Sequence, residues 1–259
     1  MFEIYHFSEP EIFSFILVLI RLSACFLAWP ILGSEQIPGQ IKVLVPLLLA
    51  FIIFPIVGWK QIANEVIGGE LPLLVIREAT VGLILGYVAR FFFMALGSLG
   101  EMVSLAVGIS TDQLLNPTIG GRTTIVEQFY VLLGSVLFLA LNGHHILISG
   151  LVQSFEVIPL SSRGLSTQSM GDLAMMLKEV PIAGLKLAAP VVVAMFIINI
   201  SMGIVSRIVP QINILITSLS VILLVGFFIM IVSLPLVLDG MHGLIDDMLK
   251  NIFNVMKVL

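Results

Sequence analysis

The sequence predicts an all-α integral membrane protein, and two observations lead to this prediction. The 259 residues are 59% hydrophobic and only 11% charged, with a mean hydropathy of +1.15, whereas soluble domains carry about 25% charged residues. Runs of about 18 or more apolar residues recur along the chain, and each is long enough to cross a bilayer core of about 30 Å as a helix.

Six long apolar runs and one shorter run predict six or seven helical passes. No linker or appended soluble domain divides them, so we expect a single all-helical membrane domain over residues 1–259. Prolines recur within the runs, and each one removes a backbone N–H and kinks or ends its helix. We therefore expect kinked helical hairpins, formed from residues of about 11–32, 41–58, 71–97, 124–142, 181–205 and 212–238, with the shorter run at 144–160.

Two polar segments and the C-terminus break the apolar pattern. Ser169 and Asp172 form a capping-box-like start, followed by apolar residues at helical spacing, which predicts a short amphipathic helix over 169–180. At about 239–259, apolar residues share one helical stripe opposite the charges. This C-terminal amphipathic helix should lie on a membrane surface or on a partner, along the stripe of Met241, Leu244, Ile245, Met248, Leu249, Ile252, Phe253 and Met256.

The longest polar interruption is the loop GISTDQLLNPTIGGR at about 108–122. Its backbone groups have no helical partners, so the loop cannot face lipid and must lie in water, against protein or along a cavity. Gly100, Ser104 and Gly108 precede it at four-residue spacing and would let the helix end pack closely. An ordinary external loop is one interpretation, and a segment packed where several helices converge is the other.

Four charged residues interrupt the apolar runs at Arg21, Arg77, Glu78 and Arg90. A charge at the bilayer centre costs about 2.5–3.5 kcal/mol on insertion scales, so such residues face a partner charge or water. We predict a structural ion pair between Arg21 and Glu78; a substrate or proton path is the alternative.

Close helix contact is expected at the GxxxG of Gly82 and Gly86, either inside the chain or with other subunits. A second expected feature is a helix-breaking turn in SRIVPQIN, because Pro210 cannot continue the hydrogen-bond ladder. Polar neighbours can cap the exposed helix ends, so we predict a hairpin turn built from Arg207, Pro210, Gln211 and Asn213, with partner binding as the alternative.

Motifs for catalysis, metals and nucleic acid are absent from the sequence. It has no HExxH, P-loop or Gly-x-Ser-x-Gly. The adjacent His144 and His145 point about 100° apart on a helix and chelate one ion poorly. The net charge of −4 without a basic cluster argues against nucleic acid. We expect no enzyme and no cofactor; a small multipass permease and an intramembrane enzyme are the weaker alternatives.

Four segments in order resemble the FliR family of flagellar export-gate proteins, from about residue 11 to 240. The first is Arg21, then Pro30, then ILGSEQIPGQIK; the second is Glu78 with Gly82 and Gly86. The third is VLFLALNGHHILISGLVQSFEVIPL. The fourth, AAPVVVAMFIINISMGIVSRIVPQINIL, carries Pro190, Asn199, Gly203, Arg207, Pro210, Gln211 and Asn213. Asn116 and Leu215 depart from the family pattern, and the Asn-Gly-His-His turn favours the flagellar branch over the injectisome branch.

The resemblance implies a non-enzymatic, pore-forming subunit of the flagellar type III export gate in the bacterial inner membrane and flagellar basal body. Its fold would resemble a fusion of FliP-like and FliQ-like units within a helical assembly. Its partners would be FliP, FliQ and FlhB, together with membrane lipids and exported flagellar proteins as substrates. The loop would then be a plug that closes the pore at rest, formed by Ser110, Thr111, Asp112, Leu114, Leu115, Asn116, Pro117, Gly120, Gly121 and Arg122.

Overall fold

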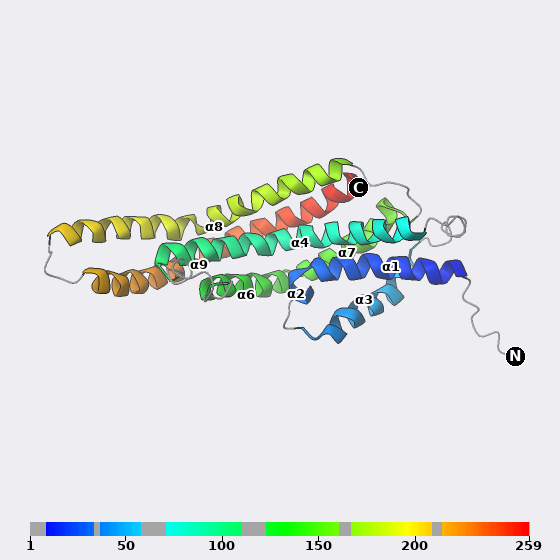
Figure 1. The fold of residues 1–259 in the computed structure, drawn as a ribbon, viewed down its shortest axis with the longest axis horizontal. Helices are drawn as coiled ribbons and strands as arrows, with labels where there is room; N and C mark the ends of the chain where they lie inside the picture. The colour runs from blue at the N-terminus through cyan, green and yellow to red at the C-terminus, as the bar shows by residue number, and fades with distance from the viewer. Residues whose placement is uncertain are drawn as a thin grey trace. The chain divides into compact units, whose positions relative to one another are not determined.

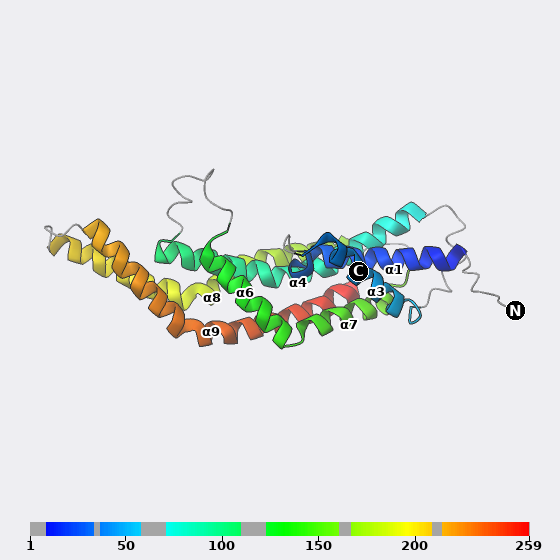
Figure 2. The same cartoon turned by 90° about the horizontal axis from the view of Figure 1, so that it is seen from below.

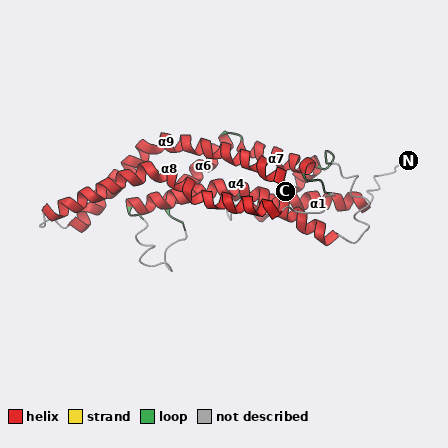
Figure 3. Cartoon of the chain, turned by 90° about the horizontal axis from the view of Figure 1, so that it is seen from above, coloured by secondary structure: helices red, strands yellow, loops and turns green. Residues whose placement is uncertain are grey.

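A computed structural model describes residues 9–33, 37–57, 71–109, 123–160, 167–208 and 214–258. All regular structure within these ranges is helical (Figure 3), which confirms the all-α membrane fold. The helices are α1 (Glu9–Ala28), α2 (Pro30–Gly33), α3 (Gly39–Ile53), α4 (Leu71–Val107), α6 (Ile125–Ala140), α7 (Gly143–Val157), α8 (Thr167–Ile208) and α9 (Ile214–Val258).

Candidate membrane spans are fewer than the six or seven passes that we expected. Within the described residues, four helical stretches are long and apolar enough, in α1, α4, α8 and α9. A fifth is possible if α6 and α7, which are bent by 67° at their short break, cross as one unit. The run at 41–58 yields only the 15-residue α3, which ends at Ile53, because Pro55 has no backbone N–H with which to continue the helical hydrogen bonds.

Helix α8 corrects a second expectation. The separate amphipathic helix predicted over 169–180 is wrong, because α8 runs without a break from Thr167 to Ile208. Pro181 and Pro190 lie inside it. Each proline removes one backbone donor, and the flanking apolar residues continue the helix on both sides.

The described helices group into two compact units. Unit 1 comprises residues 1–91, 142–177 and 247–259, and unit 2 comprises residues 92–141 and 178–246. Helix α4 contributes its first half to unit 1 and its second half to unit 2. The single membrane domain expected from the sequence stays a prediction.

In unit 1, α1 packs between α3 and the first half of α4 (Figure 1). Phe15 contacts the rings of Phe51 and Phe54, at centroid distances of 4.8 and 5.6 Å. On the other side, Gly82 and Gly86 lie directly against the α1 backbone: a Cβ on Gly86 would stand only 2.6 Å from Ala28 Cβ. The GxxxG therefore serves contact inside the chain.

In unit 2, the second half of α4 runs antiparallel to α6. Leu96 packs against Gly134, and the rings of Phe92 and Phe93 face Phe138 at 6.1 and 5.7 Å. Helices α8 and α9 lie side by side in both views (Figures 1 and 2), where Gly240 of α9 packs on Leu187 of α8.

The C-terminal stripe lies elsewhere than the sequence predicted. It belongs to the end of the continuous α9, and its residues Met241, Ile245 and Ile252 are each 3% exposed or less. Within unit 1, Ile252 packs against Gly150 of α7. The expectation of a membrane surface or a partner is wrong for this stripe, because the chain's own helices cover it, while Asp246 and Asp247 are exposed.

Candidate functional site

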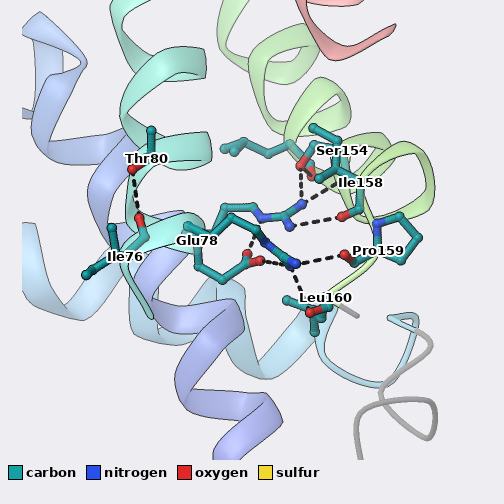
Figure 4. Close-up of polar contacts among 10 residues, drawn as sticks. Ile76, Glu78, Thr80, Ser154, Ile158, Pro159 and Leu160 are labelled. Carbon is teal, nitrogen blue, oxygen red and sulfur yellow. Dashed lines mark hydrogen bonds and ion pairs between the residues drawn. The ribbon is translucent and has the colours of Figure 1, made fainter. Parts of the chain in front are cut away.

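A buried charge cluster, defined here as Arg21, Arg77 and Glu78, joins α1 to α4 (Figure 4). Arg21 Nε lies 2.6 Å from Glu78 Oε2, and Arg77 Nη2 lies 2.5 Å from Glu78 Oε1. Arg21 and Glu78 are fully buried, and Arg77 is 7% exposed. One carboxylate thus serves two guanidinium groups, and the structure brings together the two residues that we expected to pair.

Backbone carbonyls at the end of α7 supply further acceptors to the cluster. Arg21 Nη1 donates to Ser154 O at 2.9 Å, and Nη2 donates to Ile158 O at 3.0 Å. Arg77 Nη2 donates to Pro159 O and Leu160 O at 3.1 and 2.8 Å. The C-terminal end of a helix carries the negative end of its dipole. Arg21 therefore caps the end of α7, and Arg77 binds the two residues that follow the helix and its C-cap.

The cluster carries two positive charges and one negative charge. Glu78 neutralises one of them, and the carbonyl dipoles stabilise the excess. The Phe155 ring adds a cation–π contact, with its centroid 4.2 Å from Arg21 Cζ. Among the described residues, Nε and Nη1 of Arg77 are buried without a hydrogen-bond partner. The sequence did not predict Arg77 or the α7 carbonyls as partners; only the adjacency of Arg77 to Glu78 pointed to the former.

The second polar feature, here called the loop base, is the pair of helix ends that flank the predicted plug loop. Helix α4 ends at Val107 and is followed by Gly108, which has a φ of 82°. The N–H of Ile109 donates to Ser104 O at 3.1 Å. This is the bond of a Schellman cap, in which a left-handed glycine satisfies the last carbonyls of a helix.

Helix α6 begins with a capping box. Thr124 Oγ1 accepts from the N–H of Glu127 at 3.0 Å, and Glu127 Oε2 accepts from the N–H of Thr124 at 3.3 Å. Gly100 of α4 lies against Glu127, where a Cβ would come within 2.9 Å of the Glu127 backbone nitrogen. The two helix ends that flank the loop are therefore fixed by local hydrogen bonds and by the close approach of α4 and α6.

The plug loop itself lies outside the described residues, from Ser110 to Arg122, so its role stays a prediction. The same holds for Pro210, Gln211 and Asn213 of the predicted hairpin turn. Arg207 is described and is exposed near the end of α8. Helix α8 ends at Ile208 and α9 begins at Ile214.

The histidine pair lies at the turn between α6 and α7, which contains the left-handed Asn142. The rings of His144 and His145 are 4.1 Å apart, and His145 Nδ1 lies 3.2 Å from Asn142 Oδ1. In the part of the chain that the structure describes, no three His, Cys, Asp or Glu side chains gather where they could hold a metal ion.

Comparison with known proteins gives one family over most of the chain. Residues 12–248 match the bacterial export proteins, family 1. The flagellar biosynthetic protein FliR of Bacillus subtilis is 27% identical over 252 residues, which cover 95% of each chain. The FliR protein of Caulobacter vibrioides is 30% identical over 219 residues, 84% of this chain and 87% of its own length. That of Escherichia coli is 26% identical over 248 residues, 93% of this chain and 92% of its own.

The matched residues extend across both units and include the charge cluster and both helix ends of the loop base. The chain belongs to the FliR family of flagellar biosynthetic proteins, among the bacterial export proteins of family 1.

Proposed function

We propose that this membrane protein, whose family gives it a role in flagellar export, is a pore-forming subunit of the flagellar type III export gate. It passes unfolded flagellar subunits across the bacterial inner membrane at the flagellar basal body and has no catalysis of its own. The similarity to FliR proteins over 84% to 95% of the chain carries this proposal.

The lengths of the helices support an assembly that extends beyond the bilayer. Helices α4, α8 and α9 have 37, 42 and 45 residues, so they rise about 55 to 68 Å at 1.5 Å per residue. A hydrocarbon core of about 30 Å covers only half of such a helix. The remainder needs water or protein around it, as in a complex with FliP, FliQ and FlhB.

The loop base supports a gate at residues 110–122. A gate needs fixed ends, and the Schellman cap at Gly108 and the capping box at Thr124 fix the helix ends on either side of residues 110–122. Leu114 and Leu115 supply apolar side chains that can seal a pore against water and ions, and Gly120 and Gly121 supply backbone freedom.

Deletion of residues 111–120 in a complex with FliP and FliQ tests the proposal. We expect the complex to assemble in normal amounts and to conduct ions in planar bilayers at rest, because the seal is removed while the helix caps remain. The intact complex, measured in parallel, sets the closed level.

A complete deletion complex that stays at the closed level would remove the plug from the proposal. Failure of the intact chain to associate with FliP and FliQ would overturn the gate itself. Saturable flux of a small solute through the chain alone in liposomes would instead favour a multipass permease.

A further inference from the structure

One face of α4 within unit 1 is uncovered. Leu73 and Ile76 are 67% and 63% exposed, and Leu83 and Tyr87 are 40% and 42% exposed. The face continues at alternating spacings of three and four residues through Leu73, Ile76, Thr80, Leu83, Tyr87 and Arg90. This average spacing of 3.5 residues is that of a seam between two packed helices.

The other faces of the same helix are already used inside the chain. Val81 and Leu85 are buried. Gly82 and Gly86 lie against the α1 backbone, so the small residues that could have served a contact between subunits serve an internal one. The exposed seam is the face of this half of α4 that remains for another molecule.

Arg90 indicates what that molecule is. It is exposed and lies 19 residues from the start of α4 and 17 from its end, near the middle of a candidate membrane span. Its guanidinium stands over the Tyr87 ring at 5.6 Å, and within the described chain no carboxylate pairs with it. A charge that faces hydrocarbon within such a span is costly, so lipid is a poor cover for the seam, whereas a carboxylate on a protein partner neutralises the charge.

We infer that the seam binds an apolar helix of another gate subunit, and that this helix carries an Asp or Glu opposite Arg90. The inference rests on the proposed function, because it needs a multisubunit gate. Apolar side chains on both sides of Arg90 provide packing, and the single charge fixes the register of the two helices.

Charge reversal in the full chain, co-expressed with FliP and FliQ, tests the inference. Native mass spectrometry of solubilised membranes gives the fraction of the chain found in the complex. We expect R90E to lower this fraction about tenfold or more, since an interfacial charge pair becomes repulsive. R90K should retain most of it, and K178E, at an exposed position on α8, should leave it unchanged.

A photocrosslinking residue at position 83 gives a second measurement that does not depend on how R90E folds. An adduct with a gate subunit in intact cells supports the inference, and an adduct with phospholipid alone overturns it. Equal complex fractions for R90E and the unaltered chain also overturn it, whereas a chain that never enters a complex with FliP and FliQ contradicts the proposed function.

Discussion

The charge cluster of unit 1 and the loop base of unit 2 solve the same problem in different ways. Both place polar groups inside a chain that is mostly apolar. The cluster satisfies Arg21 with acceptors 57 to 137 positions away along the chain, whereas the loop base satisfies its groups within five residues through Gly108 and Thr124. The first therefore depends on tertiary packing, and the second depends on local backbone geometry.

The difference in partners implies a difference in energy. A buried charge that loses its partner keeps its desolvation cost, which is commonly 3–5 kcal/mol. A helix end that loses its cap side chain loses one local hydrogen bond, and the cost is commonly about 1 kcal/mol. We therefore expect a substitution in the charge cluster to lower the free energy of unfolding more than a substitution in the loop base does, by the difference between these two costs.

The largest effect is expected for E78Q. It leaves Arg21 and Arg77 buried without a carboxylate, and we expect the free energy of unfolding in detergent to fall by about 3–5 kcal/mol. The control is E101Q, because Glu101 is exposed on the same helix and should change stability by about 0.5 kcal/mol or less. Equal effects of the two substitutions would contradict a structural role for the cluster.

A smaller effect is expected where α4 crosses α1. In G86A the new Cβ would lie 2.5 Å from Cys25 O and 2.6 Å from Ala28 Cβ, so the helices must separate, at about 1–3 kcal/mol of unfolding free energy. Nothing lies within 4 Å of a Cβ on Gly203. G203A, measured in the same denaturation series, should be neutral or stabilising, and a G203A loss that matched G86A would show that crowding is not the cause.

The smallest effect is expected at the loop base. T124A removes the side-chain acceptor for the N–H of Glu127, and we expect about 1 kcal/mol of local stability to be lost. Hydrogen exchange at the Glu127 amide should then quicken about fivefold, while exchange in α7 stays unchanged. T123A is the control, because the Thr123 hydroxyl accepts from the exposed Gln128 side chain at 3.1 Å and is not part of the capping box. Equal exchange in both variants would argue against the cap.

The sequence predicted the features that follow from the free-energy cost of burying one charged side chain. The high cost of burying Arg21 required a carboxylate, and Glu78 was the nearest carboxylate on another apolar run. The two arginines also use backbone carbonyls at the end of α7 and just after it. Every residue has such a carbonyl, so no side-chain pattern marks these acceptors. The C-terminal stripe of Met241 and Ile252 shows the same limit, since amphipathicity identifies the face that is covered but does not identify what covers it.

Proline was informative in one helix and misleading in another. Pro55 correctly marks a helix boundary, which shortens the run at 41–58 to α3. Pro181 follows an amphipathic segment and suggested a boundary, yet α8 continues through it. The loss of one backbone hydrogen bond can be offset when the helix on both sides of the proline is stabilised by packing. Composition alone does not reveal how well those two segments pack.

The spacing of the charge cluster along the chain has a consequence for biogenesis. Arg21 donates to the backbone of Ser154, which lies 133 positions later. At about 5–20 residues per second, roughly 7 to 27 s separate the synthesis of the two. During that interval Arg21 has neither its α7 acceptors nor, until α4 is made, its carboxylate. Until α4 and α7 are made, nothing in the chain offsets the cost of burying Arg21. We therefore expect α1 to reach its buried position only after α7 has been synthesised.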